Sequence, residues 1–445
     1  MRWWQKLILA GLALLVLVGI LVILVISVPS LNERVTNRID EVRIRIFYTL
    51  SPPEQAVFSP SGGKVDPTVE AIVQATMAYI SAAFSPTPSP TIAATATPLP
   101  PDAPTPTLTP TPSPLPASAL IENVPYVDQH YGYNNCAPSN LTMALKFWGW
   151  PGTREQVSDA VKPFSKDKNV MPYELVDYVN DQTGLRALTR VGGTPELLKQ
   201  MIASGYPVII ESGVYLRDLS GVVSWMGHYQ VVYGYDDAKQ IWQIKDSFEQ
   251  NGDHYTDTYD ALVRSWRDFD YAFIVVYPPA QEATVLQALG AYADDAAANQ
   301  IAADKAAAEI NDLKGQEQFF AYYNRGTSLY RLSDFNGAAQ AYDQAFKLYA
   351  SLSGDQRPWR MVWYQTGPYY AYFNTGRLQD VIDLASKTIN AASEPYIEES
   401  WYWRARAKAQ LGNTQGAVED LRKSLEYHPG FGPSVSLLQT LGVAP

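Results

Sequence analysis

Hydrophobic residues follow three different patterns along the 445-residue chain. Residues 7–28 form one uncharged apolar run, which as a helix spans roughly 33 Å, the thickness of a bilayer core. Over residues 119–279, helically spaced apolar positions give way to short β-branched and aromatic runs, whereas over 280–445 the apolar spacing is helical throughout. The pattern predicts a transmembrane helix, then an α+β domain, then an all-α domain.

The first 118 residues are predicted to anchor and space the rest. The apolar run in residues 1–28 exceeds the ~7–15 residues of a cleavable signal peptide, and no small-x-small site follows it, so we expect a retained single-pass anchor. Residues 29–84 show amphipathic helical spacing, which predicts a juxtamembrane helical segment. Residues 85–118 are almost entirely Pro, Thr, Ser and Ala, which predicts a disordered, extended stalk. Such a stalk favours an extracytoplasmic location for the globular domains.

Turn and capping residues divide the α+β region into elements. Helices are expected at 153–162, 172–181 and 194–204, where Thr or Pro stands at each start. Strands are expected at 207–210, 228–235, 241–244 and 271–277. Because the helices precede the strands with few alternations, the layout is that of an α+β domain.

The chain contains a single cysteine, Cys136, at a predicted helix start. Pro138 suits the first turn, and helical spacing continues until Gly149. The partial positive charge at a helix N-terminus favours the thiolate, which is the nucleophilic form of the thiol. Gln129, seven residues upstream, offers an amide that could donate to an oxyanion. The alternative is that Cys136 is a small buried residue without chemistry.

A predicted hairpin supplies a base for this nucleophile. Residues 236–240 are a short connection, so the flanking strands are expected to pair antiparallel. If Tyr235 opposes Ile241, His228 and Asp246 are diagonal neighbours on one face. The carboxylate could then orient the imidazole and stabilise its charged form. A slip of one residue would turn Asp246 to the other face, and the alternatives are a half-buried strand histidine and a turn aspartate.

Composition excludes several classes of function. The net charge of −11 and pI of 5.0 argue against a nucleic-acid partner. One cysteine excludes an intramolecular disulfide and a zinc site built on several thiolates. The four histidines, at 130, 228, 254 and 428, show no paired ligand spacing. We therefore expect no metal and no cofactor.

The C-terminal region contains a repeat of two helices. Aligned small and apolar residues recur as Ala338-x3-Tyr342, Val381-x3-Ala385 and Ala417-x3-Leu421. The best copies are 319–352 and 398–431, with a weaker one near 362–395, and they resemble tetratricopeptide repeats. Stacked repeats leave a concave surface for a peptide or protein partner, which predicts binding. The alternative is a plain helical bundle.

Residues 119–279 resemble a peptidase family. The stretches that carry the resemblance are V-P-Y-V-D-Q (124–129), N-N-C-A-P-S-N (134–140), G-H-Y-Q-V-V-Y-G-Y-D-D (227–237) and I-W-Q-I-K-D (241–246). They are similar to the papain-like bacteriocin-processing (double-glycine leader) cysteine peptidases, family 39, and to their stand-alone relatives. The resemblance implies a papain-like fold.

The resemblance also assigns roles to four residues. It implies Gln129 as oxyanion donor, Cys136 as nucleophile, His228 as general base and Asp246 as the orienting carboxylate. Two positions depart from the family: Ala137 and Ser247 stand where it often has Gly and Pro. No phosphate-binding loop and no multi-span region accompany the domain, so a transporter-coupled leader peptidase is not expected.

Together these features predict a membrane-anchored extracytoplasmic cysteine peptidase. It would hydrolyse a peptide or protein substrate, and its helical repeats would bind that substrate or a protein partner. Trp225, three residues before His228, is a candidate for the wall of the substrate cleft, with a packed core position as the alternative. Two other functions stay open: a non-catalytic peptide-binding scaffold, and a transglutaminase-like acyl transferase that uses the same cysteine. The intact Cys/His/Gln set favours an enzyme.

Overall fold

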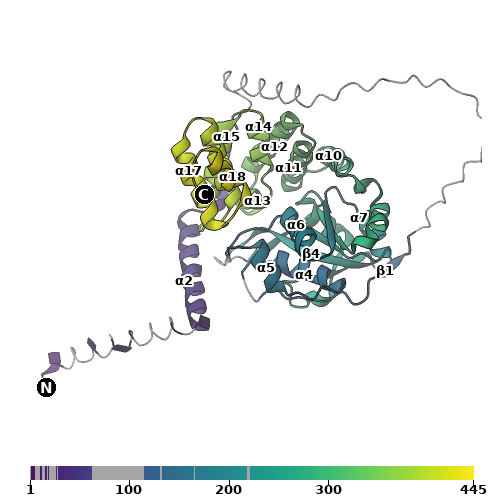
Figure 1. Ribbon diagram of the computed structural model, residues 1–445, viewed down its shortest axis with the longest axis horizontal. Coiled ribbons are helices and arrows are strands. Elements are labelled where there is room, and N and C mark those ends of the chain that lie inside the picture. The colour runs from purple at the N-terminus through teal and green to yellow at the C-terminus, as the bar shows by residue number, and fades with distance from the viewer. Residues whose placement is uncertain are drawn as a thin grey trace, which may run out of the picture.

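The computed structural model describes residues 2–5, 11–12, 16–17, 19, 27, 29–62, 115–130, 133–164, 166–217 and 221–445. Three predicted segments lie wholly or mostly outside the described residues: the apolar run 7–28, the second half of the juxtamembrane segment, and the stalk up to residue 114. Figure 1 shows a mixed α/β domain followed by a helical array, in agreement with the predicted order. The domain boundaries at residues 119 and 279 stay predictions.

The predicted transmembrane helix is not supported. Within the residues that the structure describes, no helix combines the length and the apolar character needed to cross a membrane. The N-terminal helix α2 (Pro29–Leu50) has 22 residues, but it carries charged side chains along its length, among them Arg38, Glu41 and Arg43. Charges are costly inside a bilayer, so such a helix does not span one. The N-terminal anchor and the single-pass membrane location that depended on it are therefore corrected.

Threonine side chains cap the start of three helices of the α/β domain, where they accept from free backbone N–H groups. The described helices are α4 (Cys136–Phe147), α5 (Arg154–Val161), α6 (Pro172–Gln182), α7 (Pro195–Ala203) and α8 (Tyr259–Arg267). At α5, Thr153 and Gln156 form a reciprocal capping box. At α7, the side chain of Thr194 accepts from Leu197 N–H, and the chain leaves the helix through Gly205 at φ +88°. The predicted helices 153–162, 172–181 and 194–204 are thus observed.

Among the described residues, seven strands form one antiparallel sheet in the order β2-β7-β3-β4-β5-β6, with β1 paired to β4. The strands are β1 (Ser118–Leu120), β2 (Arg186–Arg190), β3 (Val208–Arg217), β4 (Val223–Asp236), β5 (Ile241–Lys245), β6 (Tyr255–Thr258) and β7 (Phe273–Tyr277). β1, β2 and β6 were not predicted, since they are short and lack a β-branched run. The long strands β3 and β4 form the buried centre of the sheet, against which α4 packs.

The β4–β5 hairpin has an irregular register. Near the turn, Tyr235 pairs with Trp242 and not, as predicted, with Ile241. A bulge at Tyr233 adds one residue to β4 and removes this offset, so that beyond it the pairing is the predicted one. As a result, Asp246 lies on the same face as the candidate histidine.

Helices α9 (Glu282–Leu289), α10 (Asp295–Asp312) and α11 (Gly315–Arg331) lead into the array. It continues with α12 (Phe335–Ser351), α13 (Met361–Tyr364), α14 (Gly367–Asn374), α15 (Leu378–Ala391), α16 (Glu398–Gln410), α17 (Thr414–Tyr427) and α18 (Gly432–Thr440). Short 3-10 turns lie at Pro53–Gln55, Gly252–His254, Pro279–Gln281, Gly290–Ala293 and Gly354–Gln356. The pairs α11–α12, α14–α15 and α16–α17 coincide with the three predicted copies. Ala338, Ala385 and Ala417 are fully buried between helices, which confirms the repeat pattern.

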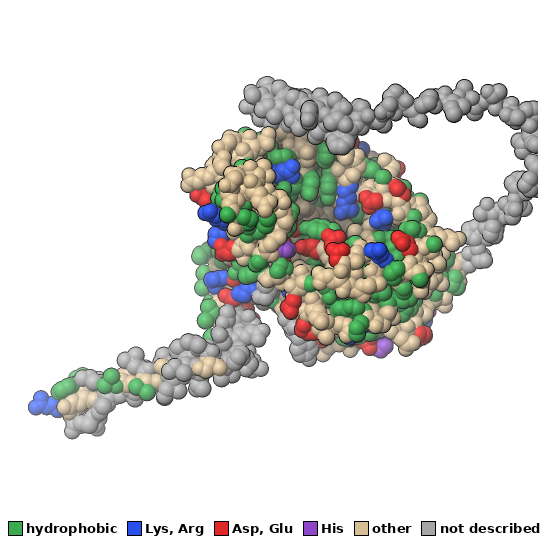
Figure 2. Space-filling view, viewed as in Figure 1, with side chains coloured by type: hydrophobic (Ala, Val, Ile, Leu, Met, Phe, Trp, Pro, Cys, Tyr) green, Lys and Arg blue, Asp and Glu red, His purple; other side chains and the backbone are tan. Residues whose placement is uncertain are grey.

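The N-terminal segment packs on both the helical array and the α/β domain. Phe58 packs edge-on against Phe346 of α12, with ring centroids 5.0 Å apart. Ser61 Oγ donates to Asp380 of α15 at 2.7 Å, and Lys166 of the α/β domain lies 2.5 Å from Asp40 of α2. Figure 2 shows this face of the molecule hollowed where the helical array meets the α/β domain. The candidate site lies at this junction.

Candidate active site

Cys136 is the first residue of α4, as the sequence predicts. Its thiol is half-buried and lines a cavity of about 310 Å³. Burial alone would raise the pKa of the Cys136 thiol, but a hydrogen bond to His228, the charge of that imidazole, and the N–H groups of Tyr229 and Ala137 lower the pKa below its ordinary value. The thiolate is therefore the favoured form over more of the neutral range than in a free cysteine.

His228 lies between this thiol and a buried carboxylate. Its Nε2 is 2.9 Å from Asp246 Oδ1, and both side chains are nearly inaccessible. Asp246 is itself fixed, because Oδ2 accepts from Gln230 Nε2 at 2.7 Å and Oδ1 accepts from Phe248 N–H at 2.9 Å. Since Nε2 is committed to Asp246, the imidazole is held in one orientation beside Cys136.

The charges of these groups reinforce one another. Burial would lower the pKa of His228, but the charge and hydrogen bond of Asp246, followed by those of Cys136, raise it to about 10. Burial would raise the pKa of Asp246, but His228 and the donors around the carboxylate lower it to about 2. The site therefore favours a thiolate, an imidazolium and a carboxylate at neutral pH.

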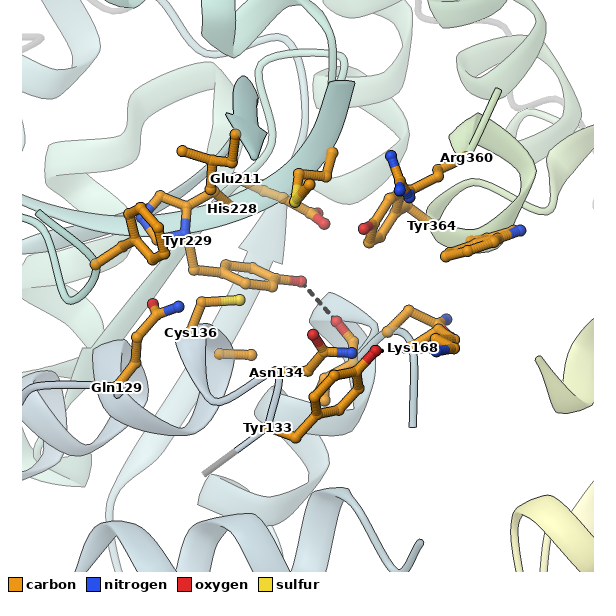
Figure 3. Close-up of a pocket in the computed structure, with 18 of the residues that line it drawn as sticks. Gln129, Tyr133, Asn134, Cys136, Lys168, Glu211, His228, Tyr229, Arg360 and Tyr364 are labelled. Carbon is orange, nitrogen blue, oxygen red and sulfur yellow. Dashed lines mark hydrogen bonds between the residues drawn. The ribbon is translucent and has the colours of Figure 1, made fainter. Parts of the chain in front are cut away.

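Gln129 presents its amide to the same cavity. Its backbone N–H donates to Ser247 O at 3.1 Å, and its side-chain Oε1 accepts from Ser247 Oγ at 2.7 Å. With Oε1 engaged, the amide nitrogen is directed toward Cys136, as Figure 3 shows. An N–H donor beside the nucleophile is suited to stabilise an oxyanion.

Asn140 and Ser247 hold these parts together, and neither was predicted to do so. Asn140, one turn after Cys136 in α4, donates from Nδ2 to Ser247 Oγ at 2.9 Å, to Cys136 O at 2.9 Å and to Tyr229 O at 2.7 Å. Ser247 is the position where the sequence departs from the family pattern, and here its hydroxyl fixes the amide of Gln129. The signal that could have indicated Asn140 is a polar residue one helical turn after the cysteine, on a helix that is otherwise mostly apolar there.

Three separate parts of the chain line the cavity, and Figure 3 labels residues of two of them, the α/β domain and the helical array. The α/β domain contributes Cys136, Gln129, Glu211, His228 and Tyr229, α2 contributes Ile44 and Tyr48, and the helical array contributes Arg360, Trp363 and Tyr364. Burial, and then the charge of Cys136, raises the pKa of Glu211 well above its ordinary value, so its carboxyl favours the neutral form. Sequence patterns did not indicate Glu211, because it lies inside an apolar strand run.

Trp225 lies outside this cavity. It is 1% exposed, its Nε1 donates to Asp268 Oδ2 at 2.7 Å, and its ring stacks on Phe269 at 5.5 Å. On its other sides it meets Phe320 of α11 and Tyr364 of α13. The predicted place of Trp225 in the substrate cleft is therefore replaced by the alternative, a packed core position, here between the α/β domain and the array.

The arrangement can perform nucleophilic acyl transfer. A thiolate, a proton donor on the adjacent imidazole and an amide donor for an oxyanion face one cavity, which are the groups that attack on a carbonyl requires. Among the described residues, the candidate set of metal ligands lies elsewhere, at Asp167, Glu398 and His428. The four residues that the sequence singled out for chemistry are thus brought together without a metal ligand set.

Comparisons with known proteins agree with this architecture. Residues 121–274 match the Peptidase_C39 like family, and residues 398–430 match the tetratricopeptide repeat. A crystal structure of a C39-like peptidase from Bacillus anthracis is 17% identical in sequence, with a TM-score of 0.30, and the match covers 36% of this chain and 96% of that one.

Curated relatives match this chain over 139 residues. Aryl-hydrocarbon-interacting protein-like 1 from Mus musculus is 26% identical over 139 residues, and that from Bos taurus is 25% identical over 139 residues. These matches cover 28% of this chain and 42% of the relatives, so the chain spans less than half of their length. The chain therefore contains a C39-like peptidase domain, matched over residues 121–274, followed by tetratricopeptide-like repeats, matched over residues 398–430.

Proposed function

We propose that this protein is a cysteine peptidase that hydrolyses peptide bonds at Cys136. The observation that carries the proposal is the buried series from Cys136 through His228 to Asp246, with the amide of Gln129 beside the thiol. A structural cysteine requires none of these partners. A C39-like peptidase domain supports the same reaction class.

The reaction would proceed through an acyl-enzyme. Cys136 Sγ attacks the scissile carbonyl carbon, and the oxygen takes the negative charge within reach of the Gln129 amide and the free N–H groups at the start of α4. The tetrahedral adduct collapses, the C–N bond breaks, and the imidazolium of His228 gives its proton to the leaving amine. Water then attacks the thioester with His228 as base, which releases the acid product and the thiol.

The helical array is proposed to act in substrate or partner binding. Tetratricopeptide repeats indicate protein–protein interaction. Because Arg360, Trp363 and Tyr364 line the cavity that contains Cys136, a peptide bound there would contact the array directly. The array is thus proposed to select the peptide as well as to recruit a partner.

A thiol-directed alkylating probe tests the catalytic proposal on the full-length chain. At pH 6, Cys136 should react faster than a free thiol, and His228→Ala should slow it by about 10²-fold or more, because the imidazolium no longer stabilises the thiolate. His254→Ala is the matched control, since the side chain of His254 is 82% exposed. Equal rates for Cys136 and a free thiol, unchanged in His228→Ala, would exclude a catalytic cysteine and leave a binding scaffold.

The fate of the acyl group distinguishes hydrolysis from transfer. A peptide library incubated with the protein should yield free carboxylate ends, with one atom of ¹⁸O incorporated from labelled water. Addition of a primary amine should leave these products in place. If the acyl group were instead transferred to the added amine, so that amides formed in place of the carboxylate ends and at the same rate, the site would be that of an acyl transferase.

A further inference from the structure

A second cluster of functional groups lies at the junction of the two domains. Asp167, in the loop that precedes α6, meets Glu398 at the start of α16 and His428 after α17, with one possible ligand atom of each within 4.8 Å of the others. Asp167 and Glu398 are 2% and 1% exposed. His428 Nδ1 is 2.9 Å from Glu398 Oε1. The loop and the two helix ends therefore direct three metal-binding groups to one point.

Two further carboxylates surround this point. Glu399 and Glu174 contribute charges there, and Glu399 is 6% exposed. Glu398 Oε2 and Glu399 Oε1 are buried and have no hydrogen-bond partner among the described residues. Buried oxygens of this kind require a proton or a cation.

Two lysines nearby, Lys162 and Lys168, do not neutralise all the carboxylates of this cluster. Lys162 Nζ donates to Tyr133 O and to Asn135 Oδ1, and burial lowers its pKa. Lys168 Nζ donates to Tyr133 OH at 2.9 Å and lies 3.8 Å from Glu394. The charge of Lys162 opposes that of Asp167, but the hydrogen bonds of Lys162, like that of Lys168, go to acceptors outside the cluster.

We propose that Asp167, Glu398 and His428 bind a divalent transition-metal ion, with Glu399 supplying further negative charge. Two carboxylates and one imidazole are hard and borderline ligands that Zn²⁺ and Mn²⁺ accept. A tetrahedral ion with bonds of about 2.0–2.2 Å separates its ligand atoms by about 3.4 Å. The present separations, 2.9 Å between His428 Nδ1 and Glu398 Oε1 and at most 4.8 Å across the set, lie on either side of that value.

The ion would connect the cavity wall to the helical array. Asp167 directly precedes Lys168, Asn169 and Val170, which line the cavity that contains Cys136. Ligands from α16 and from the end of α17 would fix this loop on the array. The site therefore joins elements that are 231 and 261 residues apart in sequence, by the differences 398 − 167 and 428 − 167.

Equilibrium dialysis against Zn²⁺ tests the proposal on the full-length chain. The parent protein carries Cys136→Ser, which removes the other group with high zinc affinity, so the result does not depend on the peptidase activity. We expect about one Zn²⁺ per chain and a Tm that rises with Zn²⁺ and falls with a chelator. Asp167→Asn and His428→Gln should each lower the affinity at least tenfold, whereas His254→Gln, at an 82% exposed side chain, should not change it.

A second measurement uses the parent protein alone, so it tests the proposal even if the variants do not fold. Co²⁺ bound to the parent should give visible d–d absorption without a thiolate charge-transfer band, and Zn²⁺ should remove it. Binding of less than one tenth of an equivalent of Zn²⁺ to the folded parent would overturn the proposal and leave protons as the groups that neutralise the cluster. Undiminished binding by folded Asp167→Asn and His428→Gln would overturn it as well.

Discussion

At the residue scale, the charge state of His228 depends on Asp246. Burial would lower the pKa of His228, but the carboxylate, followed by Cys136, raises it to about 10. Asp246→Asn removes this charge, so the pKa of His228 should fall and the alkaline limb of the kcat/KM profile should move to lower pH. We expect kcat/KM at neutral pH to drop about 10²–10⁴-fold. Asp159→Asn, in the exposed face of α5, is the control, and an unmoved alkaline limb would contradict the orienting role.

The same pair makes folding stability depend on pH. Because the pKa of His228 is raised from 6.5 to about 10, its contribution is complete below pH 6.5 and is lost as the pH rises through about 10. The pKa of Asp246 is lowered from 3.8 to about 2, so its contribution is complete above pH 3.8 and is lost as the pH falls through about 2. Urea midpoints measured at pH 7 and pH 10.5 should therefore differ more in the wild type than in His228→Ala. Equal differences would exclude a charged His228 in the folded protein.

Ser247 is expected to act as a positioning residue. Ser247→Ala leaves Gln129 Oε1 and one donor position of Asn140 without their partner, which costs about 1–3 kcal/mol and frees the Gln129 amide to rotate. The result should be a kcat about tenfold lower, with KM unchanged. Alkylation of Cys136 develops no oxyanion, so its rate should stay the same; a slower alkylation would indicate a general structural defect. Ser351→Ala, in an exposed position at the end of α12, is the control.

At the element scale, the sequence predicted correctly those helices whose ends are fixed by contacts between residues close together in the chain. The caps at Thr153 and Thr194 and the exit at Gly205 involve residues within a few positions, so sequence placed α5 and α7 correctly. β1 and β2 are held by strands that lie far away in the chain, whereas β6 pairs with the preceding strand β5 but has only 4 residues to carry a β signal. The bulge at Tyr233 was likewise not predicted, because it depends on how both strands pack.

The candidate site follows the same division. Spacing and family resemblance indicated Gln129, Cys136, His228 and Asp246. The structure brings the first three to one cavity, and Asp246 lies buried behind His228, 2.9 Å from its Nε2. The supporting contacts of Asn140 join residues 89 and 107 positions away, which no local pattern encodes. The cluster of Asp167, Glu398 and His428, proposed above to bind a metal ion, had no signal in the sequence, since a search for paired histidine spacing does not find one histidine and two carboxylates that are far apart in the chain.

Arg377 provides a test of how the helices of the array are joined. Its guanidinium donates to both oxygens of Asp343 in α12 at 2.8 and 2.9 Å and to Asp380 in α15 at 2.7 Å. Arg377→Met leaves these carboxylates without their cation, and we expect a loss of about 3–5 kcal/mol in urea unfolding. Lys423→Met removes an exposed pair with Glu426 and should cost less than about 0.5 kcal/mol. Similar losses in both variants would contradict a special role of the buried pair.

At the scale of the whole molecule, the cavity depends on the packing of the array against the α/β domain. Trp225 lies at the centre of this packing, between Phe269 and Phe320, and contacts Asp268 through its indole N–H. Tyr364 of α13 packs on the same ring and also lines the cavity. One aromatic residue is thus committed to the interface, whereas the other has a face toward the candidate site.

Substitution of these two residues should separate packing from substrate binding. Trp225→Ala removes a fully buried indole and should cost about 3–5 kcal/mol in stability, with kcat and KM near wild type at a temperature where the protein is folded. Tyr364→Ala removes an aromatic contact of about 1 kcal/mol with a bound peptide, so KM should rise about fivefold while the rate of the small thiol probe stays constant. Steady-state kinetics and thermal unfolding of both variants distinguish these outcomes. A KM that rises in Trp225→Ala but not in Tyr364→Ala would return Trp225 to the substrate cleft and remove the array from its wall.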